Sequence, residues 1–187
     1  VGPSAYRRDE EARRQTLEHF RFNLRRMIDL ADSAGAKVLL VTPASNLKDS
    51  PPFKSEPRLG LAADDQRSVV GLFEKALQAV STERWEEAVS ALDEVVALDD
   101  RYAGAHYHRG RALYALGRYP EAKQAYERAL EEDVCPLRAL SEIRQIVTET
   151  AAENGVKVVD FHTLVEQQAE HGIPGSEEFL DHVHPTI

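Results

Sequence analysis

The residues best suited to chemistry stand near the C-terminus, in Asp181-His182-Val183-His184-Pro185. An Asp three residues before a His can accept a hydrogen bond from one imidazole nitrogen, which leaves the other nitrogen to take a proton. Asp181 and His184 have this spacing, so the pattern predicts an orienting acid and a general base. One alternative is a metal site formed by Asp181, His182 and His184; another is a surface turn with incidental histidines. Since no further ligand stands at motif spacing, we expect neither a metal nor a cofactor.

Two helix–strand units are expected to position this pair. Apolar residues recur every three or four positions between residues 17 and 31, which predicts a helix that ends near Ala34-Gly35. They are Leu17, Phe20, Leu24, Met27, Ile28 and Ala31. The continuous apolar run at 38–41 then predicts a strand covered on both faces. A second helix over 137–153 and a strand over 156–160 follow, and this order is typical of a parallel sheet.

A repeat separates the two units. Trp85-Glu86-Glu87-Ala88 is echoed 34 residues later by Tyr119-Pro120-Glu121-Ala122. Small and bulky residues recur at the same spacing, and Gly110 falls where two helices should approach most closely. The corresponding pairs are Ala88 and Ala122, Leu92 and Tyr126, and Val95 and Ala129. Residues 69–136 therefore resemble two tetratricopeptide repeats; the alternative is a plain pair of helical hairpins.

That resemblance implies a groove for a protein or peptide partner, lined by the first helix of each repeat. The positions that would line it are Phe73, Leu77, Val80, Tyr107, Arg111 and Tyr114. Because apolar and aromatic side chains dominate, we expect an apolar peptide or helix as the ligand. The alternative is that the chain's own α/β part fills some of the groove. The helix over 137–153 is expected both to cap the repeats and to cover the sheet.

The sequence before and around His182 and His184 supports a second resemblance. After the Val-Val-Asp strand come Gly172-Ile173-Pro174-Gly175, then Phe179-Leu180-Asp181, and then an Asp-x-x-His-Pro element. Together these features resemble the last block of the SGNH, or GDSL-type, serine hydrolases. This resemblance implies that His184 is a catalytic base and Asp181 its orienting acid. Residues 10–50 and 137–187 would be the C-terminal part of such a domain. The family's Gly-Asp-Ser nucleophile block is missing, so we expect an ester substrate only for a longer protein and no activity from this chain alone.

Asn46 and Ser176 are the other polar residues to consider for this site. Asn46 follows the first predicted strand at its carboxyl end, where open α/β sheets bind ligands, so it is a candidate pocket residue. Its alternative role is to form a turn. Ser176 lies in a loop without the strand-to-helix turn of a nucleophile, and we interpret it as an ordinary loop serine.

The predicted fold class is an α/β remnant, two parallel strands with helices, which carries an all-α helical-hairpin insertion and is mostly α overall. Residues 51–68 are the expected linker into the repeats. A sheet of two parallel strands leaves an edge open, so we expect edge pairing or a homodimer. The function is predicted to be protein interaction, with the base-donating part of a serine esterase as the alternative.

Composition narrows the classes of partner. The chain has 187 residues and is 42% hydrophobic. Its net charge of −9 argues against nucleic acid as a partner, because contacts with phosphates need clustered Lys and Arg. Acidic residues interrupt the Arg-rich stretch at 7–26, so we expect a solvated helix face there. Cys135, the only cysteine, excludes an internal disulfide. Neither a membrane span nor a signal peptide near Val1 is recognised, which fits a soluble protein and is compatible with the bacterial cytoplasm.

Overall fold

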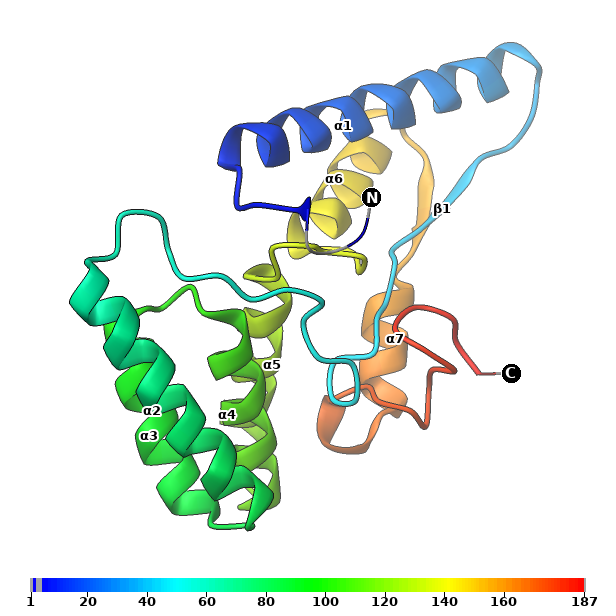
Figure 1. The fold of residues 1–187 in the computed structure, drawn as a ribbon. Helices are drawn as coiled ribbons and strands as arrows, with labels where there is room; N and C mark the ends of the chain where they lie inside the picture. Colours follow the sequence, from blue (N-terminus) through cyan, green and yellow to red (C-terminus); the bar gives the residue numbers. More distant parts are fainter. Residues whose placement is uncertain (1, 3–4, 187) are drawn as a thin grey trace.

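The computed structural model describes residue 2 and residues 5–186; Val1 lies outside them. The chain is mostly helical with one pair of short strands, as predicted (Figure 1). The elements, in chain order, are α1 (Glu10–Ser33), β1 (Leu39–Val41), α2 (Ala63–Ser81), α3 (Trp85–Leu98), α4 (Ala103–Ala115), α5 (Tyr119–Glu131), α6 (Ser141–Glu153), β2 (Lys157–Val159), α7 (Phe161–Gln168) and the short 3-10 helix η2 (Glu170–Gly172). None of the described helices is long and apolar enough to cross a membrane.

Helix α1 begins and ends where the sequence provides the signals for it. The Asp9 carboxylate accepts a hydrogen bond from the Ala12 amide at 2.9 Å and caps the first turn. Gly35, with φ +70°, takes the chain out of the helix. The apolar stripe packs on α6 through Leu17, Phe20 and Leu24, which contact Ile146 and Val147. The prediction that Met27 belongs to this stripe is wrong, because Met27 is 63% exposed.

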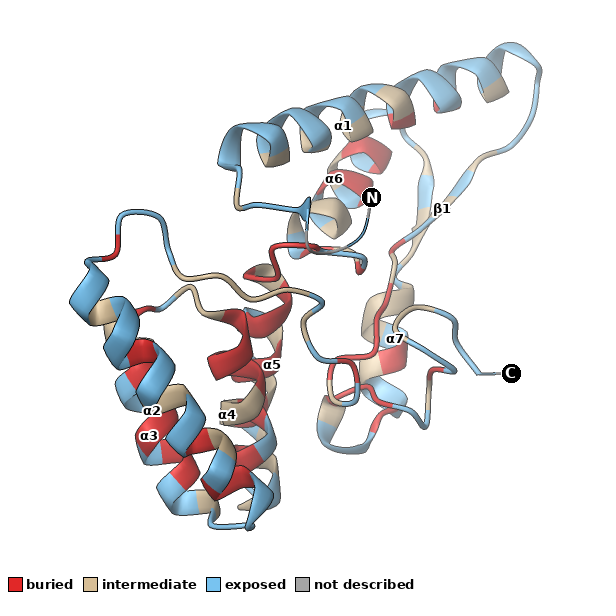
Figure 2. Cartoon of the chain, in the orientation of Figure 1, coloured by how far each residue is buried: buried red, intermediate tan, exposed pale blue. Residues whose placement is uncertain are grey.

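Strands β1 and β2 pair in parallel, with Leu40 opposite Val158. Leu40 packs into the cluster between α1 and α6, so both helices cover the same face of the pair. Leu39 and Val41 point to the other face and are 57% and 51% exposed. The expectation of a strand covered on both faces is therefore wrong for the described residues (Figure 2). The outer edge of β1 has no partner strand in the described chain, and edge pairing between two copies stays a prediction.

The segments that flank the repeats differ from expectation. Helix α2 starts at Ala63, so the last residues of the expected linker are helical, and Asp64 and Asp65 stand in the first turn. Acidic side chains are favourable there because they face the positive end of the helix dipole. Helix α6 starts at Ser141, four residues later than the predicted start at 137, and packs on α1 and both strands. Leu140, just before it, belongs to the core of the repeats.

The repeats are two helical hairpins, α2 with α3 and α4 with α5, stacked through α3 and α4. The small and bulky positions predicted to face inward are all buried in their core: Ala88, Leu92, Val95, Ala122, Tyr126 and Ala129. Gly117 ends α4 with φ +72°, and Glu83 adopts φ +57° at the equivalent position after α2. A left-handed conformation is costly for a residue with a Cβ, so the first repeat is the less regular of the two.

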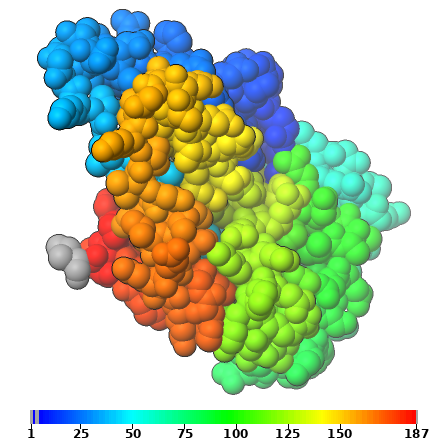
Figure 3. Space-filling view, turned by 180° about the vertical axis from the view of Figure 1, so that it is seen from behind, coloured from blue at the N-terminus to red at the C-terminus, as the bar shows by residue number. Residues whose placement is uncertain are grey.

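The repeats are joined to the rest of the chain by a shared core. Leu47, from the loop after β1, and Ile173, from the loop after η2, are both buried in the core of the repeats. Lys123 of α5 also pairs with Glu166 of α7 at 2.9 Å. Seen from behind, the segments that follow β2 lie directly against the repeats (Figure 3). The hairpins are therefore fixed to the strand pair and do not hang on a free linker.

Replacing Gly110 tests the close approach inside the second hairpin. A Cβ added there would lie 2.8 Å from Cδ1 of the buried Tyr126 ring, so Gly110→Ala should destabilise the fold by about 1–3 kcal/mol, as other overpacked cores do. An added Cβ at Gly71 of α2 would meet only open space, so Gly71→Ala should be neutral or stabilise by up to about 1 kcal/mol. Urea unfolding of both variants measures this. Equal effects from the two substitutions would contradict the packing described here.

Candidate functional site

Asp181 and His184 are brought together as their spacing predicts. We call residues 180–185 the Asp–His loop. Oδ2 of Asp181 lies 2.7 Å from Nδ1 of His184, and Oδ1 accepts the amide N–H groups of Val183 and His184, both at 2.8 Å. These two amides, and then the imidazole, hold the pKa of the Asp181 carboxyl well below its usual range. With the proton on Nδ1, the neutral imidazole of His184 keeps Nε2 as an acceptor, and its side chain is 73% exposed.

Asn46 reaches this loop from the segment that follows β1. It is buried, its amide N–H donates to the carbonyl of His182 at 3.1 Å, and Nδ2 donates to the carbonyl of Asp181 at 3.3 Å. Its Oδ1 accepts the amide of Asp49 at 2.8 Å, which is the turn that was the alternative role. Asn46 therefore forms a turn and also holds the backbone of the Asp–His loop. A role in a substrate pocket stays a prediction.

Ser176 lies near this loop in the sequence, but its hydroxyl has another partner. Oγ donates to Oδ2 of Asp49 at 3.0 Å, and its amide N–H donates to the same oxygen at 2.8 Å. The serine therefore tethers its loop to the segment after β1, which agrees with its interpretation as a loop residue. His182, the other histidine considered for a metal, packs edge-on against Phe53 at 5.1 Å between ring centroids. The described residues hold no group of three or more candidate metal ligands.

The inner face of the repeats is partly filled by the chain itself. The Tyr107 hydroxyl donates to the carbonyl of Lys48 at 3.1 Å, and the Lys48 ammonium lies 5.3 Å from the ring centroid of Tyr114. Tyr114 also donates to Glu170 at 3.4 Å. Such contacts are of the kind that a bound peptide would make with aromatic side chains. The alternative, that the α/β part occupies some of the groove, thus describes the second repeat.

The other candidate groove residues differ in how far they are buried. Phe73 packs edge-on against Tyr102 at 5.1 Å between centroids, and Val80 is 7% exposed inside the core. Leu77 is half-buried, and Arg111 is exposed. The structure therefore places all six candidates on α2 and α4; only Arg111 is exposed, and Leu77 is half-buried, as are Phe73 and Tyr114.

Several residues around these surfaces were not identified from the sequence. Lys48 had no motif to mark it, and His171 stacks on Tyr119 with ring centroids 3.4 Å apart only because η2 folds back on the repeats. Arg138 and Asp133 are buried where the repeats end. The one sequence signal for Arg138 and Asp133 is that they are charged residues in the predominantly apolar segment around Leu137 and Leu140. Their spacing does not predict which groups they contact.

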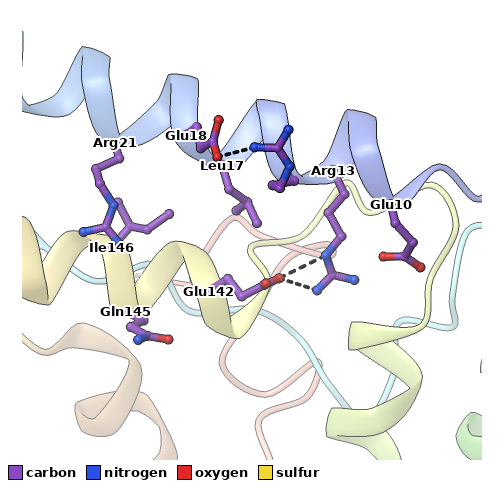
Figure 4. Close-up of a pocket in the computed structure, with 9 residues that line it drawn as sticks. Glu10, Arg13, Leu17, Glu18, Arg21, Glu142, Gln145 and Ile146 are labelled. Atoms are coloured by element: carbon purple, nitrogen blue, oxygen red, sulfur yellow. Dashed lines mark hydrogen bonds and ion pairs between the residues drawn. The ribbon is translucent and has the colours of Figure 1, made fainter.

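The Arg-rich stretch forms an interhelical ladder where a solvated face was expected. Arg13, Arg21 and Arg25 of α1 pair with carboxylates of α6: Glu142, Glu149 and Glu153. Figure 4 shows the groove between the two helices, where Arg13 reaches Glu142. Arg14, which also lines the groove, pairs with Glu18 on its own helix. Because the charged side chains that line the groove are engaged in ion pairs, we assign the groove no ligand.

A pH titration of stability tests the environment of His108, whose ring packs against Phe73 and Tyr107. Burial, and then the charge of Arg111, lowers its pKa from 6.5 to about 4. Between these values the unfolded chain binds a proton that the folded chain does not, so stability should fall as pH drops from 6.5 to about 4. Urea unfolding across this range should show a shallower decline for His108→Phe. His19→Phe, on the exposed side of α1, should keep the wild-type decline. Identical declines in wild type and His108→Phe would contradict this assignment.

Comparison with known proteins identifies the central part of the chain. No curated protein and no solved structure matches it. A family model described as tetratricopeptide repeat matches residues 73–133, which spans the C-terminal part of α2 and all of α3, α4 and α5. This segment therefore carries a tetratricopeptide repeat, which marks it as a protein–protein interaction module.

Proposed function

We propose that this chain recruits a protein partner through the inner face of its repeats, and that the ligand is an apolar peptide or helix. The family match and the stacked hairpins support this proposal. Tyr107 and Tyr114 are already engaged by the chain's own loops, so the partner's share of the face centres on Leu77 and Arg111. Leu77 and the exposed Arg111 hold equivalent positions of the two repeats, 34 residues apart, which favours a ligand that carries both an apolar side chain and an acidic group.

Binding by peptides selected on the folded chain tests this proposal. Leu77→Asp removes the apolar contact and Arg111→Glu reverses the charge, so each should weaken a selected peptide by tenfold or more, a loss of about 1.4 kcal/mol. Arg84→Glu, in the turn between α2 and α3, is the matched control and should bind as wild type does. Titration calorimetry measures all three. Peptides that bind Leu77→Asp and Arg111→Glu with unchanged affinity would place the interaction surface elsewhere.

A second function is favoured by one geometric observation, the 2.7 Å contact between Asp181 and His184. We propose that residues 10–50 and 137–187 are the C-terminal part of an SGNH-type serine hydrolase, with an upstream Gly-Asp-Ser as nucleophile in a longer chain and an ester as substrate. His184 would act as the base through Nε2, and Asp181 would hold its tautomer. The parallel pairing of β1 with β2 supports this proposal, since helix–strand units of this kind build such sheets.

Ester hydrolysis by a longer form of the protein tests this second function. His184→Ala removes the base and should lower kcat by a factor of about 10³–10⁶, as loss of a triad histidine does. His19→Ala, exposed on α1, should retain activity. The 187-residue chain by itself should be inactive. Hydrolysis that survives His184→Ala, or a longer protein without any ester hydrolysis, would contradict the hydrolase assignment.

A further inference from the structure

The Asp–His loop has hydrogen bonds within itself, but contacts with other segments fix its position in the fold. Besides the contacts of the Asp181 carboxylate, the amide N–H of Leu180 donates to the carbonyl of His184 at 2.7 Å. Asp181 and His184 are both substantially exposed, so their side chains gain little support from packing. The backbone of Asp181 and His182 is instead held by Asn46 through two hydrogen bonds. Whatever fixes Asn46 therefore also fixes the base and its orienting acid.

Arg138 fixes Asn46. We call residues 46–50 the bridging segment. The Nη1 atom of Arg138 donates to the carbonyl of Asn46 at 2.9 Å and to that of Ser50 at 2.7 Å, so one guanidinium nitrogen joins both ends of this segment. The side chain of Arg138 is 2% exposed. If the bridging segment rotated or shifted, at least one of these two hydrogen bonds would break. The two bonds therefore restrain the segment to a single position.

The charge of Arg138 is balanced by a carboxylate at the end of the repeats. Asp133, whose side chain is fully buried, lies 4.0 Å from Nη2 of Arg138. Burial lowers the pKa of Arg138 and raises that of Asp133, since removal from water penalises both charges. A buried pair at this distance contributes little net stability, because the desolvation cost offsets the attraction. Its geometric effect on the bridging segment is the better explanation for its presence.

A second route leads from the same pair to the same loop. Asp133 accepts the amide N–H groups of Phe53 at 2.8 Å and Lys54 at 3.0 Å, which fixes the backbone at Phe53. The Phe53 ring then packs edge-on against His182, with centroids 5.1 Å apart. Two independent chains of contacts, through Asn46 and through Phe53, thus converge on residues 181 and 182.

We propose that Arg138 and Asp133 are positioning residues for the Asp181–His184 pair, acting through Asn46 and Phe53. This inference rests on the proposed hydrolase function for its catalytic meaning. It extends the site from the C-terminal loop to the junction where the tetratricopeptide repeats end. The repeats and the base then share one buried anchor, so their relative position is fixed by the same guanidinium.

Nuclear magnetic resonance of the imidazole nitrogens in the 187-residue chain tests this proposal without any substrate. In the wild type, neutral His184 should carry its proton on Nδ1. Arg138→Lys keeps the charge, but its side chain is one bond shorter and withdraws the donor from the two carbonyls that Nη1 joins, so His184 should lose this single tautomer. Phe53→Leu should cause a smaller change of the same kind. Arg84→Lys, remote from the loop, should leave His184 as in the wild type.

His106 supplies an internal control for folding, because its Nε2 lies 2.8 Å from the carbonyl of Asp100 inside the repeats. A change at His184 with unchanged His106 signals would support the proposal. A folded Arg138→Lys variant in which His184 keeps its single tautomer would overturn it. If Arg138→Lys does not fold, Phe53→Leu decides, and an unchanged His184 there would overturn the proposal. Because no hydrolysis is measured, failure of the hydrolase assignment would leave this result standing.

Discussion

The buried attachment of the bridging segment to the end of the repeats is the contact on which the remainder of the structure depends. Arg138 donates to two carbonyls of this segment while Asp133 balances its charge, and Leu47 adds an apolar side chain to the core of the repeats. Breaking one partner of such a buried pair typically costs about 3–5 kcal/mol, a large share of the stability of a domain of this size. The repeats and the strand pair are therefore expected to behave as one body.

That attachment also limits what the repeats can bind. Lys48 of the bridging segment contacts Tyr107 and Tyr114, so the chain itself occupies part of the inner face of the second repeat. A two-repeat array has little further surface. For the apolar peptide or helix that we propose as the partner, the remaining positions are Leu77 and Arg111. In the proposed hydrolase, the same attachment would keep the base at a fixed distance from any bound partner.

Local patterns predicted the elements well, and contacts between distant segments poorly. The 34-residue echo gave the hairpins and the place of Gly110, and the apolar runs gave the parallel pair of Leu40 and Val158. The three-residue spacing gave the contact between Asp181 and His184 because both lie in one turn. By contrast, the exposure of Leu39 and Val41 depends on which helices cover the sheet, and the roles of Lys48 and Arg138 depend on partners about 60 and 90 residues away; periodicity carries no such information.

The most direct test of this account compares unfolding of the two parts in one experiment. Trp85, the only tryptophan, packs against the core of the repeats and reports on them by fluorescence, while amide exchange at Leu40 and Val158 reports on the strand pair. If the buried attachment joins the parts, both signals should follow one cooperative transition with the same midpoint in urea. Two separate midpoints, with the repeats still folded after the strand amides have lost protection, would contradict it.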